Sequence, residues 1–167
     1  MADMPFNVLF ISTRNSARSI MAEALLRELG RPRFSAYSAG SFPADEVHPA
    51  ALKTLAAMRV STQGLASKSW NVFGEPDAPK MDFVFTVCDI AAGEVCPVWP
   101  GHPASAFWGV DDPTVVQGSD EHAARAFHDT AMLLKRRIEL FLALPDHKLD
   151  ALSLQHQLNA IGRAGHP

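Results

Sequence analysis

The sequence predicts an α/β domain in which a four-stranded parallel β-sheet carries helices on both faces. Two short runs, residues 8–11 and 83–87, are apolar apart from Thr86, which is typical of strands buried on both sides of a parallel sheet. Such runs alternate along the chain with segments of helical apolar spacing, an order that favours right-handed crossovers between parallel strands. The chain has 167 residues, 47% of them hydrophobic, which is enough for one core, so we predict a single domain over residues 1–167.

The first unit of this fold consists of a strand, a polar loop and a helix. Residues 6–11 form the apolar strand, which is expected in the centre of the sheet. Eight small, polar or basic residues follow, from Ser12 to Ser19. A helix with regular apolar spacing then covers residues 20–29 and ends at Gly30.

Three further strands and three further helices complete the predicted domain. We expect the strands at residues 34–38, 83–87 and 106–110, and the helices at 49–58, 121–144 and 149–161. The core-facing stripe of the helix at 121–144 is predicted to consist of Ala126, Phe127, Met132, Leu133, Ile138 and Phe141. The last helix, in a C-terminal extension at 149–163, is amphipathic and is expected on the surface or against a partner.

Charge and composition exclude several classes of function. Fifteen Lys and Arg against eighteen Asp and Glu give a net charge of −3, so nothing draws the chain to nucleic acid or to an anionic membrane. The apolar runs are too short to span a bilayer, and residues 1–7 lack the pattern of a secretion signal. The two cysteines, Cys88 and Cys96, have no histidine close by in sequence to complete a metal site. We therefore expect a soluble, cytoplasmic protein with no metal, no cofactor, and no nucleic-acid or membrane partner.

The loop at residues 12–19 is the first candidate for a functional site. It follows the central strand, and the ligands of open parallel sheets bind beyond the carboxyl ends of the strands. Backbone N–H groups and the helix dipole favour an anion there, and Arg18 adds a planar guanidinium that can bind two oxygens at once. This combination suits a tetrahedral oxyanion such as phosphate or arsenate. The glycine pattern of dinucleotide-binding loops and the Walker lysine are absent, and an ordinary polar turn whose serines cap the helix stays open as an alternative.

The loop and several later motifs resemble a known family. Residues 8–19 resemble the phosphate loop of the low-molecular-weight protein tyrosine phosphatases and the related thioredoxin-coupled arsenate reductases, whose pattern is cysteine, five residues, arginine and serine. Six later segments resemble arsenate-reductase-like members in the same order: Ala36–Gly40, Val47–Pro49, Ser67–Trp70, Phe85–Asp89, Gly93–Pro97 and Trp108–Pro113. The resemblance extends from Asn7 to Arg163 and implies a flavodoxin-like three-layer fold, with the active site in the loop after the first strand.

The resemblance also implies roles for individual residues. Ser12, Arg18 and Ser19 fall on the nucleophilic cysteine, the arginine and the serine of the family loop, and Asp112 falls on the general acid of the family's Asp-Pro pair. The residues expected to surround an oxyanion are Thr13, Arg14, Asn15, Ser16, Ala17, Arg18 and Ser19. Cys88 and Cys96 match the two cysteines that relay oxidation as a disulfide in the arsenate reductases. The implied partners are phosphate, arsenate or sulfate, together with a thioredoxin-like reductant or a phosphoprotein.

Ser12 departs from the family at the attacking position. A helix N-terminus and nearby cations lower the pKa of a thiol from about 8.5 to roughly 3.5–7.5, which makes it a thiolate at neutral pH. The same groups cannot ionise a serine hydroxyl, and a serine nucleophile needs an adjacent base, which the loop lacks. His48 could approach from another loop, although a solvated or capping role is the simpler expectation. We therefore expect an oxyanion-binding protein with impaired catalysis.

Two origins of Ser12 stay open at this stage. It is either a natural replacement or one introduced into an active arsenate reductase or phosphatase. Arg14 stands where the family loop usually has glycine, and this second departure favours the natural origin. The Arg14 side chain either adds a cation over the anion or points into solvent, and a positive φ there would strain the loop. Asn15 tolerates such a backbone and can tie the loop together.

Other residues have plainer alternatives. Asp112 before Pro113 is also a common turn sequence, and the two cysteines could be small buried apolar residues. A protein of another class, which docks a partner through the surface around Trp70, Trp99 and Trp108 and keeps only a vestigial pocket, is the remaining alternative.

Overall fold

A computed structural model of the chain describes residues 5–88, 104–145 and 154–162. Within these ranges a four-stranded parallel sheet has the order β2-β1-β3-β4. The strands are β1 (Phe6–Ser12), β2 (Phe34–Gly40), β3 (Phe83–Thr86) and β4 (Ala104–Phe107). The apolar strand β1 lies in the centre, as predicted, and its register pairs Ser12 with Gly40.

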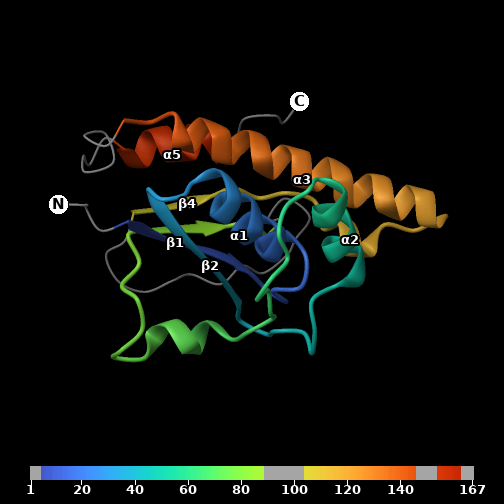
Figure 1. Cartoon of the computed structure of the whole chain (residues 1–167), viewed down its shortest axis with the longest axis horizontal. Coiled ribbons are helices and arrows are strands. Elements are labelled where there is room, and N and C mark those ends of the chain that lie inside the picture. Colours follow the sequence, from blue (N-terminus) through green and yellow to red (C-terminus); the bar gives the residue numbers. More distant parts are fainter. Residues whose placement is uncertain (1–4, 89–103, 146–153, 163–167) are drawn as a thin grey trace.

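Helices lie on both sides of the sheet, so the predicted layered α/β fold is confirmed. The α-helices are α1 (Arg18–Leu29), α2 (Pro49–Ala57), α3 (Asp120–Leu142) and α5 (Leu154–Gly162), and two short 3-10 helices are η1 (Trp70–Gly74) and η2 (Pro113–Val115). Figure 1 shows α3 and α5 along one side of the sheet and η1 on the opposite side. No helix in the described parts of the chain combines the length and hydropathy that a membrane crossing needs.

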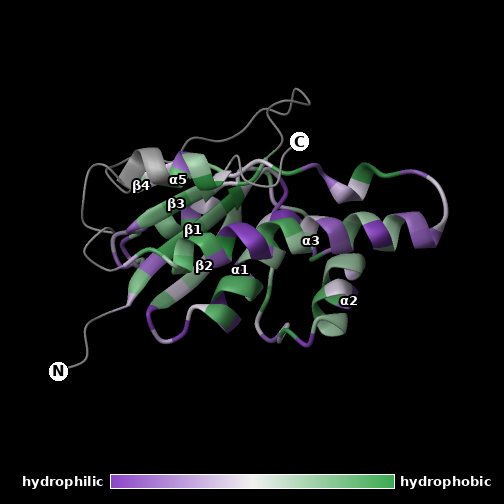
Figure 2. Cartoon of the chain, turned by 90° about the horizontal axis from the view of Figure 1, so that it is seen from above, coloured by the Kyte–Doolittle hydropathy of each residue, from purple (hydrophilic) through white to green (hydrophobic). Residues whose placement is uncertain are grey.

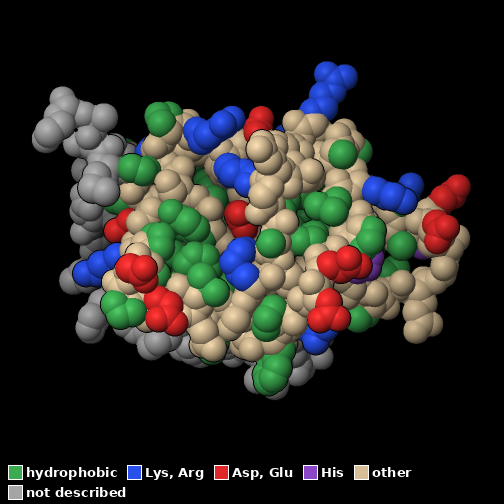
Figure 3. Space-filling view, turned by 60° about the horizontal axis from the view of Figure 1, so that its bottom comes forward, with side chains coloured by type: hydrophobic (Ala, Val, Ile, Leu, Met, Phe, Trp, Pro, Cys, Tyr) green, Lys and Arg blue, Asp and Glu red, His purple; other side chains and the backbone are tan. Residues whose placement is uncertain are grey.

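The pleat of β1 divides the core into two clusters. Val8 and Phe10 join the larger cluster, under the α-helices, whereas Leu9 and Ile11 join a smaller one that η1 covers. Figure 2 shows these central strands as hydrophobic and much of α3 as hydrophilic. Figure 3, with the η1 side turned forward, shows hydrophobic side chains gathered on this face among charged ones. The sheet is therefore buried on both sides, which explains the apolar sequence of its central strand.

Trp108 lies at the centre of the larger cluster. Its side chain is fully buried and stacks on Phe85, with ring centroids 3.8 Å apart. Its indole N–H donates to the carbonyl of Leu158 in α5 at 3.0 Å. Leu158 is itself buried, so α5 belongs to the core of this chain and does not merely lie on its surface. An added Cβ on Gly162 would lie 2.3 Å from the carbonyl oxygen of Phe107, which shows how closely α5 approaches β4.

Two details of the predicted elements are wrong. Met132 was expected in the core stripe of α3 but is 43% exposed, whereas Leu134 is fully buried. The buried stripe begins at Phe127 and recurs every three or four residues, and Met132 lies one position beyond it, about 100° round the helix. The fourth strand was expected at 106–110 but spans Ala104–Phe107, and beyond its end only isolated backbone hydrogen bonds, from the N–H groups of Trp108 and Val110 to the carbonyls of Thr86 and Val87, are found in the described residues.

Candidate active site

The loop between β1 and α1 is organised around Asn15. This residue is fully buried and has a φ of 50°, in the left-handed region that asparagine tolerates. Its side-chain Nδ2 donates to Ser19 Oγ at 2.8 Å and to Ser38 Oγ at 3.0 Å, and its Oδ1 accepts from the backbone N–H of Lys68 at 2.9 Å. Asn15 therefore ties the loop to α1, β2 and the segment before η1, and the predicted tie is confirmed.

Hydrogen bonds from a neighbouring segment fix the orientation of the loop peptides. The carbonyl oxygens of Thr13, Arg14 and Ser16 accept backbone hydrogen bonds, each of 2.9 Å, from the segment between β2 and α2. The C=O and N–H groups of a trans peptide point in opposite directions, so the N–H groups that follow these carbonyls point toward the inside of the loop. The N–H of Asn15 does so, because it donates to Ser12 Oγ at 3.2 Å. The loop thus has the form of an amide cradle.

Gly40 allows this close packing between the loop and β2. An added Cβ at Gly40 would lie 2.6 Å from the carbonyl oxygen of Thr13 and 3.0 Å from the backbone nitrogen of Asn15. A larger residue would push the loop away from the end of β2. Gly40, the last residue of the Ala36–Gly40 segment, therefore supports the site directly.

Ser12 occupies the end of β1, inside the loop. Its hydroxyl is 2.6 Å from Ser19 Oγ and accepts the N–H of Asn15, and neither partner is a base at neutral pH. His48 caps α2, where its Nδ1 accepts from the N–H of Ala50 at 3.1 Å, and its ring packs on Phe127 at 5.0 Å. The capping role expected for His48 is confirmed, and Ser12 has no basic partner in the part of the chain that the structure describes.

Arg18 and Asp112, which are far apart in sequence, meet beside the loop. The Arg18 side chain is only 5% exposed, and its Nη2 is 3.5 Å from Asp112 Oδ2. Its Nη1 donates to the carbonyl of Val110 at 3.3 Å. Asp112 also caps η2, because its Oδ1 accepts from the N–H and the hydroxyl of Thr114 at 2.9 and 2.7 Å. A buried cation and a partly exposed carboxylate therefore adjoin the cradle.

Two sequence-based alternatives for the loop are wrong. The N-cap of α1 is Ala17, which has no side-chain cap, so serine capping of this helix is not the purpose of the loop. Arg14 does not have a positive φ, since in the described residues only Asn15 and Arg59 have one among non-glycine residues. The Arg14 side chain is exposed, which matches the solvent-pointing alternative, and the strain considered for it does not arise.

A buried polar network supports the loop from behind, and the sequence does not reveal it. Ser38 Oγ, a partner of Asn15, donates to Glu23 Oε1 at 2.5 Å. Lys68 Nζ lies 3.8 Å from the same carboxylate oxygen and donates to the carbonyl of Ser38 at 3.0 Å. Burial lowers the pKa of Lys68, and the charge and hydrogen bond of Glu23 oppose that shift. Hydrogen bonds thus run without interruption from this ion pair through Asn15 to the hydroxyl of Ser12.

Arg137 anchors the segment that leads to Asp112. It is fully buried on α3, and burial lowers its pKa to about 10. Its Nη1 donates to the carbonyl oxygens of Trp108 and Gly109 at 2.7 and 3.0 Å. Two guanidinium groups, those of Arg137 and Arg18, therefore hold the carbonyls of residues 108–110. A charged residue within a helix usually indicates a solvent-facing position, so the sequence pattern hides this role.

The remaining predicted site residues lie as follows. Cys88 is buried after β3, with its Sγ 3.9 Å from Thr13 Oγ1, so it borders the loop. Cys96 and Trp99 lie outside the described residues. Trp108 is fully buried and cannot form part of a docking surface, which overturns that element of the interaction-protein alternative. The described residues contain no cluster of His, Cys, Asp and Glu that could hold a metal ion.

Comparisons with known proteins found a matching family model and several similar sequences. A family model described as low molecular weight phosphotyrosine protein phosphatase matches residues 7–155. The chain is 31% identical over 134 residues to an arsenate reductase of Halalkalibacterium halodurans, and the match covers 80% of this chain and 93% of that protein. An arsenate reductase of Bacillus subtilis is 28% identical with the same coverage.

Solved structures resemble the fold. A structure of an arsenate reductase in the phosphate binding state has a TM-score of 0.62 and 24% identity, with 83% of this chain and 97% of that chain covered. A low molecular weight protein tyrosine phosphatase from T. tengcongensis has a TM-score of 0.60 and 21% identity, with 80% and 95% covered. At these identities the likeness concerns the fold alone.

Proposed function

This chain belongs to the low molecular weight phosphotyrosine protein phosphatase family, and we propose that it binds a tetrahedral oxyanion in the loop from Ser12 to Ser19 without thiol-based turnover. The observation that carries the proposal is the buried guanidinium of Arg18 at the start of α1, beside a loop in which three carbonyl groups are hydrogen-bonded to the segment between β2 and α2. A guanidinium and inward-pointing amides together match the charge and the oxygens of phosphate, arsenate or sulfate.

The donors of the proposed site have distinct roles. The N–H groups of Arg14 and Ala17, which follow two of the outward carbonyls, are expected to contact anion oxygens, and the Arg18 guanidinium is expected to bind two further oxygens. The amides at the start of α1 add the positive end of the helix dipole, because Ala17 gives them no side-chain cap. Asp112, 3.5 Å from Arg18, would take the general-acid role that the family resemblance implies for it. Arg14, with its exposed side chain, contributes its backbone rather than its charge.

Impaired chemistry follows from Ser12. Its hydroxyl has only another hydroxyl and a backbone N–H as partners in the described residues, and neither removes its proton. The same two donors would stabilise a thiolate at this position, and Arg18 and the start of α1 would lower the pKa of that thiol. We infer that the pocket is suited to sulfur chemistry that the present residue cannot perform.

The relatives suggest which partner molecules such a pocket has in the cell. One structure that resembles the chain, at 26% identity and a TM-score of 0.53, is a thioredoxin-dependent arsenate reductase of Corynebacterium glutamicum. We extend to this chain a cytoplasmic location and two candidate partners, a thioredoxin-like reductant and a phosphoprotein. Cys88 beside Thr13 would serve the reductant only if a thiol were present at position 12. An active enzyme in which the cysteine has been replaced stays the alternative to a natural oxyanion-binding protein.

Titration calorimetry with phosphate and arsenate tests the binding. The chain is expected to bind both anions, and Arg18→Lys, which keeps the charge but loses the fork, is expected to bind about tenfold more weakly or worse. Arg14→Ala is the matched control, because it changes the charge of the same loop at an exposed side chain and is expected to stay within about fivefold. Absence of binding at millimolar anion, or equal loss in both variants, would contradict the proposal.

Turnover is tested separately, with Ser12→Cys as the comparison. The original chain is expected to show no hydrolysis of p-nitrophenyl phosphate above background and no arsenate reduction with thioredoxin. Ser12→Cys is expected to gain at least one of these activities. Equal rates in the two proteins would overturn the impaired chemistry while leaving anion binding intact.

A further inference from the structure

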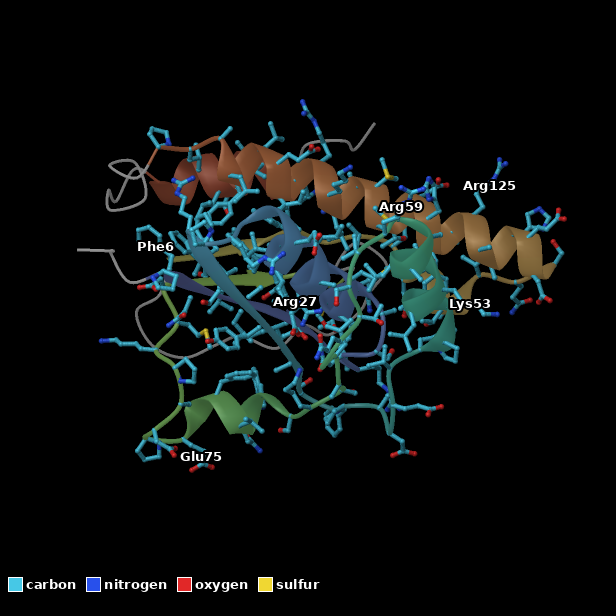
Figure 4. The ribbon with its side chains drawn as sticks, in the orientation of Figure 1. Phe6, Arg27, Lys53, Arg59, Glu75 and Arg125 are labelled. Carbon is cyan, nitrogen blue, oxygen red and sulfur yellow. The ribbon has the colours of Figure 1, made fainter. Side chains whose placement is uncertain are left out.

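A second pocket lies at the far end of α1 from the loop. It has a volume of about 350 Å³ and is lined by Leu25, Glu28, Leu29, Met58, Arg59, Val60, Met132 and Lys135. These residues come from the last turns of α1, from the segment that follows α2 and from α3. Figure 4 labels Arg59 where the chain leaving α2 passes α3. Since Arg18 begins α1 and Leu29 ends it, this pocket is separate from the candidate active site.

The floor of the pocket is aliphatic. Five of its lining residues are leucine, methionine or valine, and the three polar ones are all charged. Its only polar side chains are the three charged ones, so the aliphatic floor would leave most polar groups of a sugar or a nucleobase without hydrogen-bond partners. Leu29 and Met132 are 39% and 43% exposed. Side chains this exposed contribute little to the core, so packing of the core does not explain why these two positions are apolar. Methionines adapt their shape to a flexible aliphatic chain.

The rim of the pocket carries an excess of positive charge. Glu28 pairs with Arg31 at 3.8 Å, and this partner offsets its negative charge. Within residues 5–88, 104–145 and 154–162, the side chains of Arg59 and Lys135 make neither a hydrogen bond nor an ion pair. Two cations beside an aliphatic floor are complementary to an anionic head on an apolar tail.

The backbone at Arg59 adds an independent observation. Arg59 has a φ of 61° and follows the end of α2, where its N–H donates to the carbonyl of Ala56 and the N–H of Val60 donates to that of Leu55. Glycine is the residue that fits this helix end without strain. An arginine here strains the backbone. A binding role of its side chain in the pocket accounts for its presence at this position.

We propose that this pocket binds a small amphipathic carboxylate, with its aliphatic chain on the floor and its carboxylate between Arg59 and Lys135. The volume, at the lower end of the range for ligand pockets, suits one medium-length acyl chain. The proposal does not depend on the oxyanion site, because the two sites share only the helix that separates them.

The test uses the full chain with isotope-labelled methionine methyl groups, titrated with decanoate and followed by NMR. Met58 and Met132 are expected to shift in a saturable manner, whereas Met21 and Met81, which are buried away from this pocket, are expected to stay in place. Decan-1-ol, which lacks the charge, is expected to bind several-fold more weakly, and acetate, which lacks the tail, is expected to cause no shift.

Variants decide whether the two cations act as stated. Arg59→Gly and Lys135→Ala are each expected to weaken decanoate binding by about two- to fivefold, and the double variant by about tenfold. Arg59→Gly suits the local backbone, so a failure to fold does not confuse the result. Lys53→Ala, an exposed cation of α2 outside the lining, is the matched control and is expected to bind as the original chain does.

Three results would overturn the proposal. The first is no shift of Met58 and Met132 at millimolar decanoate. The second is unchanged affinity in the double variant, which would leave the rim charges without a role. The third is a shift of these methyl groups with protein concentration alone, which would show that a second copy of the chain fills the pocket. Loss of phosphate binding in Arg18 variants bears on the oxyanion site only.

Discussion

Asn15 provides the sharpest test of how the loop is held, because its backbone and side-chain contributions can be separated. Asn15→Gly keeps the left-handed backbone but loses three hydrogen bonds, two buried ones to Ser19 and Ser38 and a part-buried one from the N–H of Lys68. At about 0.5–1.5 kcal/mol each, their loss is expected to lower the free energy of unfolding by about 1.5–4.5 kcal/mol. Asn15→Ala loses the same bonds and in addition disfavours a positive φ, so it is expected to cost about 1 kcal/mol more.

The assay for both variants is urea unfolding, followed by the fluorescence of the tryptophans, one of which is the buried Trp108. Arg59→Gly is the control for the backbone contribution, since its φ of 61° also lies in the left-handed region and this change is expected to be neutral or stabilising. A loss under about 1 kcal/mol in Asn15→Gly would refute the role of the side-chain bonds. An Asn15→Ala variant as stable as Asn15→Gly would refute the claim that residue 15 requires a left-handed backbone.

Three further predictions concern the surroundings of the loop. Gly40→Ala is expected to lower the free energy of unfolding by about 1–3 kcal/mol and to weaken phosphate binding, because its methyl group would lie 2.6 Å from the carbonyl oxygen of Thr13. Urea unfolding and calorimetry measure the two effects. Gly74→Ala is the control and is expected to change neither, since an added Cβ there has no neighbour within 4 Å. Arg137→Met is expected to lower the free energy of unfolding in urea by about 2 kcal/mol, because the buried carbonyl of Trp108 and the part-buried carbonyl of Gly109 lose the guanidinium donor. An unchanged midpoint would show that these carbonyls find other partners. Lys68→Met tests the pH dependence of stability. Burial lowers the pKa of Lys68 in the folded chain below its ordinary value of 10.5, so the unfolded chain binds more protons than the folded chain as the pH approaches 10.5. The original chain is therefore expected to gain stability with rising pH in this range, relative to Lys68→Met. Parallel unfolding curves of the two proteins over that pH range would contradict the shift.

The fold could be predicted because its signals are local. Apolar runs such as residues 8–11 mark strands that are buried on both faces, and the polar loop before α1 marks the end of the central strand. The phase of α3 was harder, because Met132 is as apolar as its buried neighbours and only packing decides which of them faces the sheet. The strand β4 is short and partly exposed, so composition alone does not locate its end.

The candidate site likewise contains residues that the sequence indicates and residues that only the tertiary structure reveals. Arg18 and Asn15 lie in one short segment, and the residue types alone indicate what they do. The partners that hold this segment, Gly40, Lys68 and Glu23, lie elsewhere in the sequence and meet it only in the folded chain. Arg137 is a stronger case, since a helix with several charged residues gives no sign that one of them points inward to carbonyl groups. Such roles need the tertiary structure.

A crystal structure of the chain grown with phosphate tests the central claim most directly. The account predicts a phosphate ion within hydrogen-bond distance of the Arg18 guanidinium and of backbone N–H groups between Thr13 and Ser19, with the Ser12 hydroxyl beside it and unmodified. A loop closed around the Arg18–Asp112 pair with no anion inside, or phosphate bound only by the exposed side chain of Arg14, would contradict it.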